Sequence, residues 1–241
     1  MKKRILSILL MCCMVLTLLP VQVLAADYTV GEDTGVSARA LAGTAGTKLK
    51  ADNIATYIAY GLGDGVYTLA EDVTISGTLR VTGEATVDLN GYVLRYAEAA
   101  ETPDSIFRVT SGSTLTLTDS APTATHSDAS LPAGGLITGG KGFKYDNGAG
   151  QSYNYYGGGV YVETGASFVL AGGTIYACGV QSGANSAYGG GIYAEGGSVT
   201  IKGGAIRNCA VSADYGANGG GVYIYSGASF TMEGGVISGC S

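Results

Sequence analysis

The sequence predicts an all-β chain in which one small unit of short strands is stacked on itself. Three stretches carry the same pattern, Gly-Gly-Gly-(Val/Ile)-Tyr, and they begin at Gly157, Gly189 and Gly219. Successive copies start 32 and 30 residues apart. Each copy continues through a second apolar stretch to a Gly-Gly-x-Ile segment and a cysteine. A fixed period of this size indicates a repeat architecture.

Five turns of the repeat can be aligned, two of them fainter than the three glycine-rich copies. Their equivalent positions are Val81, Val109, Val162, Ala194 and Ile224. The steps between these positions are 28, 53, 32 and 30 residues. The long step is one repeat plus two insertions, a Ser/Thr/Ala/Pro-rich one at 119–133 and a Gly/Tyr/Asn-rich one at 140–156. We therefore predict about five turns.

Each turn is predicted to hold three short strands with bends between them, which closes a triangular coil. Coils of this kind stack through parallel strands about 4.8 Å apart. In the first turn we align Val87 and Leu89 with Leu115 and Leu117 of the next. The third strand of each turn is expected at Leu136-Ile137, Thr174-Ile175, Ala205-Ile206 and Val236-Ile237.

Strand alternation assigns the side chains to the two faces of each strand. The predicted inward set is Val160, Val162, Phe168 and Leu170, and the predicted outward set is Tyr161, Val169, Thr200 and Thr231. The turn glycines supply backbone conformations that other residues adopt only at a cost. The repeat is thus expected to bury an apolar column on each strand.

Three segments are predicted along the chain. Residues 1–25 read as an export signal, with positive charges at Lys2 to Arg4, an apolar run to Leu19 and a small residue at Ala25. Pro20 ends that run below the roughly 18–20 residues that span a bilayer. Residues 26–64 form a lead-in and cap, with a short helix expected within 52–62. Residues 65–241 hold the repeats. The protein is expected to be secreted or displayed on a cell surface.

Charge excludes several classes of partner. The formal charge is −6, and removing the three cationic residues of the signal takes it to −9. An acidic chain of this kind is a poor ligand for nucleic acid or for an anionic membrane surface. We predict no nucleic acid partner and no membrane insertion of the mature chain.

The motifs resemble those of a known group of proteins. They are Gly-Gly-Gly-Val-Tyr-Val, the following Phe-x-(Met/Leu)-x-Gly-Gly-x-Ile, and the segment from Val87 to Gly91. With these, residues 65–241 resemble right-handed parallel β-helix proteins of the pectin-lyase-like superfamily. More narrowly, they are similar to bacterial surface proteins with polymorphic-outer-membrane-protein-type repeats. The resemblance implies a right-handed β-helix, a fold that hosts lyases, hydrolases, adhesins and inert stalks. Because the last repeat stops at Ser241, we expect the chain to be truncated at its C-terminus.

Tyrosines are the main candidate binding residues. Tyr161, Tyr193 and Tyr223 are predicted to form an outward ladder on one flat face. Further tyrosines are expected in or beside neighbouring loops, namely Tyr153, Tyr155, Tyr156, Tyr188, Tyr215 and Tyr225. Aromatic rings with a polar tip suit stacking on sugars or docking on proteins. The alternative is that the rings stack on one another and only stabilise the sheet.

Carboxylates offer a weaker candidate site. Glu163 and Glu195 occupy one column in adjacent turns, which is the short separation of a retaining glycosidase pair. They stand at an exposed strand end, so the structural interpretation is favoured over the catalytic one. Lys202 and Glu233 are also expected to meet, as a surface ion pair.

Cysteines recur with the repeat. Cys178, Cys209 and Cys240 are spaced by 31 residues twice and so occupy one column. Export would permit a disulfide, but the spacing of stacked strands is wide for one. A straight column does not supply tetrahedral zinc ligands either. We predict three unbridged, buried thiols.

No catalytic constellation emerges from the sequence. The hydrolases of the resembled group use clustered aspartates with basic residues, and its lyases use calcium-binding acids, and neither set is found. His126, the one histidine, lies in a Ser/Thr/Ala loop without an orienting partner. We therefore predict no catalytic residue, no cofactor and no metal ligand.

The favoured function is an adhesin-like binding module or structural spacer. Its partners would be glycans or proteins of host or cell surfaces. The alternative is a β-helix polysaccharide lyase or glycoside hydrolase whose catalytic turns lie outside these residues.

Overall fold

The computed structural model describes residues 43, 46–100, 102–146, 153–182 and 186–241. The chain divides into two units, Met1–Ser37 and Ala38–Ser241, and every described residue belongs to the second. The predicted signal at 1–25 and the start of the predicted lead-in, residues 26–42, lie outside the described residues. Within the described ranges, no helix is long and apolar enough to cross a membrane.

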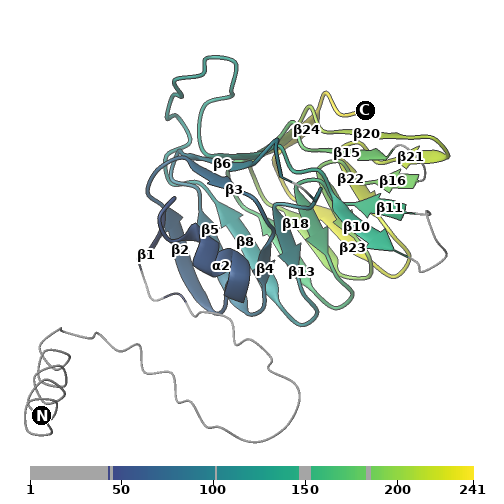
Figure 1. The fold of residues 1–241 in the computed structure, drawn as a ribbon, viewed down its shortest axis with the longest axis horizontal. Coiled ribbons are helices and arrows are strands. Elements are labelled where there is room, and N and C mark those ends of the chain that lie inside the picture. Colours follow the sequence, from purple (N-terminus) through teal and green to yellow (C-terminus); the bar gives the residue numbers. More distant parts are fainter. Residues whose placement is uncertain (1–42, 44–45, 101, 147–152, 183–185) are drawn as a thin grey trace, which may run out of the picture. The chain divides into compact units, whose positions relative to one another are not determined.

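Three parallel sheets form the body of the described unit (Figure 1). Sheet 1 has the order β1 (Thr47–Leu49), β2 (Gly65–Leu69), β5 (Glu84–Asp88), β8 (Thr114–Thr118), β13 (Ser167–Leu170), β18 (Ser198–Ile201) and β23 (Ser229–Met232). Sheet 2 has the order β3 (Val73–Ile75), β6 (Val93–Tyr96), β9 (Leu136–Thr138), β14 (Thr174–Tyr176), β19 (Ala205–Arg207) and β24 (Val236–Ser238). Sheet 3 has the order β4 (Leu79–Val81), β7 (Phe107–Val109), β12 (Val160–Val162), β17 (Ile192–Ala194) and β22 (Val222–Ile224).

The chain visits the three sheets in a repeating order. From β2 onward it passes from sheet 1 to sheet 2 to sheet 3 and then returns to sheet 1, one strand further along. Every pairing within these sheets is parallel, so each strand lies beside its equivalent from the next turn. The all-β prediction is confirmed, and the stacked parallel sheets are compatible with a β-helix.

The predicted register holds in sheet 3. Val81 pairs with Val109, Val109 with Val162, and Val162 with Ala194, which in turn pairs with Ile224. These are the five aligned positions, one on each strand of the five-stranded sheet. The predicted third strands are also found, because Ile175 pairs with both Ile137 and Ile206, and Ile206 pairs with Ile237.

One part of the predicted alignment is wrong. In the first turn Val87 pairs with Leu117, and Ala85, not Val87, pairs with Leu115. The register is shifted by two residues because the turn between β4 and β5 is shorter than the one between β7 and β8. A shift of two keeps the same side chains inward, since alternation has a period of two. The apolar column therefore survives, with Ala85 as a small member of it.

The core lies between the three sheets. The predicted inward side chains Val160, Val162, Phe168 and Leu170 are fully buried. Val169 and Thr200 are half-buried on the opposite face, and Thr231 is exposed, as predicted. The burial pattern of sheet 1 strands alternates accordingly, which is what a sheet with one face on a core requires.

The predicted helix is α2 (Ile54–Tyr60). It contacts β3 and β4, which are the first strands of sheets 2 and 3. Ile54 is buried in the core, and Tyr57 and Ile58 pack against it. The ring of Tyr57 lies edge-on to that of Tyr67 at 5.7 Å between ring centroids. The helix therefore lies at the N-terminal end of the stack.

A fourth sheet, absent from the sequence prediction, covers sheet 3. This outer sheet has the order β10 (Phe143–Asp146), β11 (Tyr153–Tyr156), β16 (Ser186–Tyr188) and β21 (Gly216–Asn218). Its strands pair in parallel except for β10 and β11, which are antiparallel. The prediction of 140–156 as an insertion is thus wrong in part, because both ends of it are strands. Figure 1 shows the outer sheet in the C-terminal half of the stack.

The triple glycines form the corner between the outer sheet and sheet 3. Each run lies between a strand of the one and a strand of the other. The first glycine of each run, Gly157, Gly189 and Gly219, has a φ of 58°, 68° and 69°. This left-handed conformation is costly for other residues, which explains why each copy starts with glycine. A shorter parallel pair, β15 (Gly179–Ser182) and β20 (Ala210–Ala213), follows the cysteine column.

Candidate functional site: a tyrosine-lined groove

The tyrosine ladder forms as predicted. Tyr161, Tyr193 and Tyr223 lie in register on β12, β17 and β22. The rings of Tyr161 and Tyr193 are parallel to within 1°, with centroids 5.5 Å apart. Those of Tyr193 and Tyr223 are parallel to within 3° at 5.8 Å. Strand spacing alone brings such side chains into contact, and stacked aromatic pairs contribute about 0.5–1.5 kcal/mol beyond their burial.

The expectation of an open, flat face is wrong for most of the ladder. Tyr161 and Tyr193 are only 6% and 5% exposed. The outer sheet covers them, and its own tyrosines pack into the ladder. Tyr156 lies 4.6 Å from Tyr193, and Tyr188 lies 5.0 Å from Tyr223, between ring centroids. The rings thus form an aromatic layer between the two sheets, which supports the stabilising interpretation for the covered part.

The aromatic layer borders a groove at the surface. In the outer sheet Tyr156 and Tyr188 are neighbours in register, and Asn218 occupies the next position of that column. The groove has a volume of about 340 Å³ and is lined by Tyr145, Asn154, Tyr156, Tyr188, Tyr193, Glu195, Tyr223 and Tyr225. We call this the tyrosine groove. Its volume lies at the lower end of the range for small-ligand sites, about 300–1,000 Å³.

The rims of the groove are the accessible part. Tyr145 on one side and Tyr225 on the other are each 51% exposed. Tyr225 follows β22, and Tyr145 lies on β10, so the rims come from different sheets. The floor is formed by rings that already stack on one another, and it therefore presents ring edges and hydroxyl groups.

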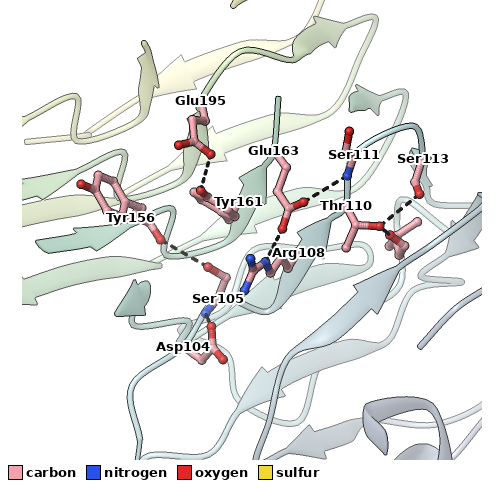
Figure 2. Close-up of polar contacts among 11 residues, drawn as sticks. Asp104, Ser105, Arg108, Thr110, Ser111, Ser113, Tyr156, Tyr161, Glu163 and Glu195 are labelled. Atoms are coloured by element: carbon pink, nitrogen blue, oxygen red, sulfur yellow. Dashed lines mark hydrogen bonds and ion pairs between the residues drawn. The ribbon is translucent and has the colours of Figure 1, made fainter. Parts of the chain in front are cut away.

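The groove holds one charged side chain, Glu195. Its Oε2 accepts a hydrogen bond of 2.7 Å from the hydroxyl of Tyr161 (Figure 2). Burial, followed by the nearby Glu195 carboxylate, raises the pKa of Tyr161 well above its ordinary value. Burial, then Tyr156 and Glu195, likewise raises the pKa of Tyr193. Both phenols are therefore neutral hydrogen-bond donors at ordinary pH.

The second candidate carboxylate, Glu163, points to a different partner. Its Oε1 accepts a 2.6 Å bond from Arg108 Nε, and its Oε2 accepts a bond of 3.1 Å from Ser111 N (Figure 2). The Arg108 guanidinium also lies 4.2 Å from the centroid of the Phe143 ring. Glu163 thus joins β7, β12 and the outer sheet. Its engagement on both oxygens favours a structural role, while the catalytic interpretation stays a prediction.

Sequence reasoning missed Arg108, although a signal for it was present. Arg108 pairs with Tyr161 in the register of sheet 3, next to the aligned positions Val109 and Val162. Because Val109 aligns with Val162, the residues immediately before them, Arg108 and Tyr161, must also be neighbours, which places the Arg108 cation beside the tyrosine ladder. The predicted ion pair of Lys202 and Glu233 is wrong, since Arg108–Glu163 is the ion pair that the described part of the chain contains.

His126 and the 119–133 insertion play a structural part. His126 Nε2 lies 2.8 Å from the Gly134 carbonyl oxygen, which ties the loop to its own exit. Asp119 accepts hydrogen bonds from the backbone of Gly91 and Gly135, which anchors the loop to two turns. Across the described residues, no group of three or more His, Cys, Asp or Glu side chains is placed to hold a metal ion.

The cysteines form the predicted column and are unbridged. Cys178 and Cys209 are buried, whereas Cys240 is half-buried in the last turn. Each thiol lies near a carbonyl oxygen of a neighbouring turn. A hydrogen bond to Cys178, together with burial, raises the pKa of the Cys209 thiol strongly. The thiolate, which is the reactive form, is therefore suppressed at Cys209.

We expect alkylation to distinguish the three thiols. In the folded protein at pH 8, iodoacetamide should label Cys240 slowly and leave Cys178 and Cys209 unlabelled, because both of these side chains are buried and the pKa of Cys209 is also raised. Labelling in urea, read by peptide mass spectrometry, should reach all three and serves as the control. A disulfide joining Cys178 to Cys209, or equal labelling of Cys209 and Cys240 in the folded state, would contradict the prediction.

Comparison with known proteins adds no family to this description. No protein-family model, no curated protein and no solved structure matches the chain.

Proposed function

We propose that the chain is a secreted or surface-displayed right-handed parallel β-helix that acts as an adhesin-like binding module. The observation that carries this proposal is the tyrosine groove, with its six phenol side chains, one carboxylate and two half-exposed aromatic rims. Aromatic side chains with polar tips are enriched where proteins bind partners. The stack supplies a rigid frame for the groove, since each turn is held by the next.

Physical rules support the finer description of the fold. Each return to the same sheet is a crossover between parallel strands, and such connections are right-handed in about 98% of cases. Three strands per turn and inward apolar columns match the resemblance to pectin-lyase-like and repeat-bearing surface proteins. In this proposal α2 caps the stack, because it lies across the first strands of two sheets, where a bare edge would invite aggregation.

Binding should depend on the two tyrosines of the last turn, Tyr223 on the floor of the groove and Tyr225 on its rim. We expect the double change Tyr223→Ala and Tyr225→Ala to weaken binding to a glycan or to a cell-surface protein by about tenfold or more, since truncated aromatic anchors commonly cost over 1 kcal/mol. The measurement is binding of the exported chain to an array of glycans and to cells. Tyr161 is unsuitable for this test because it is buried.

Tyr215→Ala is the matched control, because Tyr215 is 85% exposed and is not among the groove residues. Its binding should equal that of the unchanged chain, and circular dichroism should show all three proteins folded. Equal binding by the double variant would refute the groove as the site and leave the spacer role. Release of oligosaccharides from a polysaccharide would instead favour the enzymatic alternative.

A further inference from the structure

We propose that the tyrosine groove selects glycans that carry free amino groups. This inference deepens the proposed function and rests on it. The groove is lined by six tyrosines, one amide side chain and the Glu195 carboxylate, with no cationic side chain among them. A site of this composition is negative in formal charge, and the half-exposed ring of Tyr225 at its rim can add a negative ring face. An ammonium group is the ligand chemistry that complements it.

The geometry leaves the carboxylate open for such a group. Tyr161 occupies Oε2 of Glu195, and Oε1 receives no hydrogen bond from the part of the chain that the structure describes. Tyr225 follows β22 as Glu195 follows β17, one turn earlier, and its half-exposed ring lines the same groove as the carboxylate. A cation here meets a carboxylate and an aromatic ring at once. Such cation–π contacts contribute about 0.5–1 kcal/mol at exposed sites.

The floor of the groove explains why charge, and not ring stacking, should decide selectivity. The rings of Tyr193 and Tyr223 face one another, as do those of Tyr156 and Tyr188. A sugar ring therefore finds few free aromatic faces on the floor and contacts edges and hydroxyl groups, which serve any sugar. Uronic acids and sulfated sugars bring a negative charge to Glu195 and should be disfavoured.

Calorimetric titration with three hexasaccharides tests the inference. The probes are a β-1,4-linked glucosamine hexamer, its fully N-acetylated counterpart and a galacturonic acid hexamer, with pentalysine as a further arm. We expect the glucosamine hexamer to bind about three- to thirtyfold tighter than the acetylated one, the sum expected of one exposed ion pair and one cation–π contact. The galacturonic acid hexamer should bind most weakly.

Glu195→Gln should remove the preference, so that the glucosamine hexamer and its acetylated counterpart bind this variant with equal affinity. Glu233→Gln, an exposed acid on the last turn outside the groove, is the matched control and should retain the preference. A thermal melt of each variant checks folding.

The outcomes separate this inference from the proposed function. Equal affinity for the amine and acetylated hexamers, with loss of both in the Tyr223/Tyr225 double variant, overturns the amine selectivity and retains the groove as a site. Tighter binding of galacturonic acid, or binding of pentalysine as strong as that of the glucosamine hexamer, also overturns it. If no hexamer binds, and the chain also binds neither the glycan array nor cells, the proposed binding function is refuted.

Discussion

Gly190→Ala is expected to destabilise the stack by about 3 kcal/mol or more. A Cβ at this position would lie 2.4 Å from the Gly220 carbonyl oxygen, 2.6 Å from the Ala210 carbonyl oxygen and 2.8 Å from the Ala210 nitrogen. All three are backbone atoms, one in the next turn and two in the same repeat as Gly190, so no side chain can rotate away. Overpacking costs about 1–3 kcal/mol where side chains adjust, and more where they cannot.

Urea unfolding followed by circular dichroism measures this effect. Gly112→Ala is the control, because a Cβ at Gly112 would have no atom within 4 Å, although the residue has a φ of +78°. Its cost should be limited to about 1–2 kcal/mol, the strain of a left-handed residue. A midpoint for Gly190→Ala equal to that of Gly112→Ala would show that the turns can separate at the corner.

Phe168→Ala should have the second large effect, a loss of about 3–5 kcal/mol. Phe168 is fully buried in the middle of sheet 1, with Leu115 and Val199 as its neighbours in register. These neighbours are held by their own strands, so the cavity left by the ring cannot collapse. Thermal and urea unfolding of the variant measure the loss.

The same column supplies the control. Phe230 pairs with Val199 on the other side, and it is 39% exposed because β23 is the last strand of sheet 1. Phe230→Ala removes the same atoms from a half-open site, so its cost should be less than half as large. Equal losses at the two positions would mean that burial within the column does not set the stability of the stack.

Sequence reasoning recovered the elements that repeat. The positions Val81 to Ile224 recur with an apolar side chain in each turn, and the structure pairs them in that register. The cysteine column and the inward faces followed from the same periodicity. The register of Val87 was misplaced because the turn before β5 is two residues shorter than its equivalent in the next repeat. The two-residue shift leaves the same side chains pointing inward, so the alternation of apolar residues does not reveal it.

The outer sheet was missed because its strands lack the usual signals. Gly216-Ala217-Asn218 pairs as β21 although glycine and asparagine are depleted in strands. These residues are extended because they pair in register with β16, next to the triple-glycine corner. Tertiary context therefore outweighs their low intrinsic strand propensity. The burial of Tyr161 and Tyr193 followed from that sheet and was therefore missed with it. The groove is lined by side chains of the outer sheet as well as of sheet 3, so it could not be predicted without the outer sheet.

The antiparallel strand β10 gives the groove a polarity. It ends the outer sheet on one side with an antiparallel strand, so a further strand in the parallel register of the repeat would be added beside β21. Duplicating residues 189–218 within the chain would therefore add one strand to each layer and lengthen the groove by about 4.8 Å, without altering any existing contact at its closed end. The number of copies of this 30-residue repeat would then set the length of the ligand that the groove can bind. Such a surface can gain avidity by recombination alone, with no new side chain required.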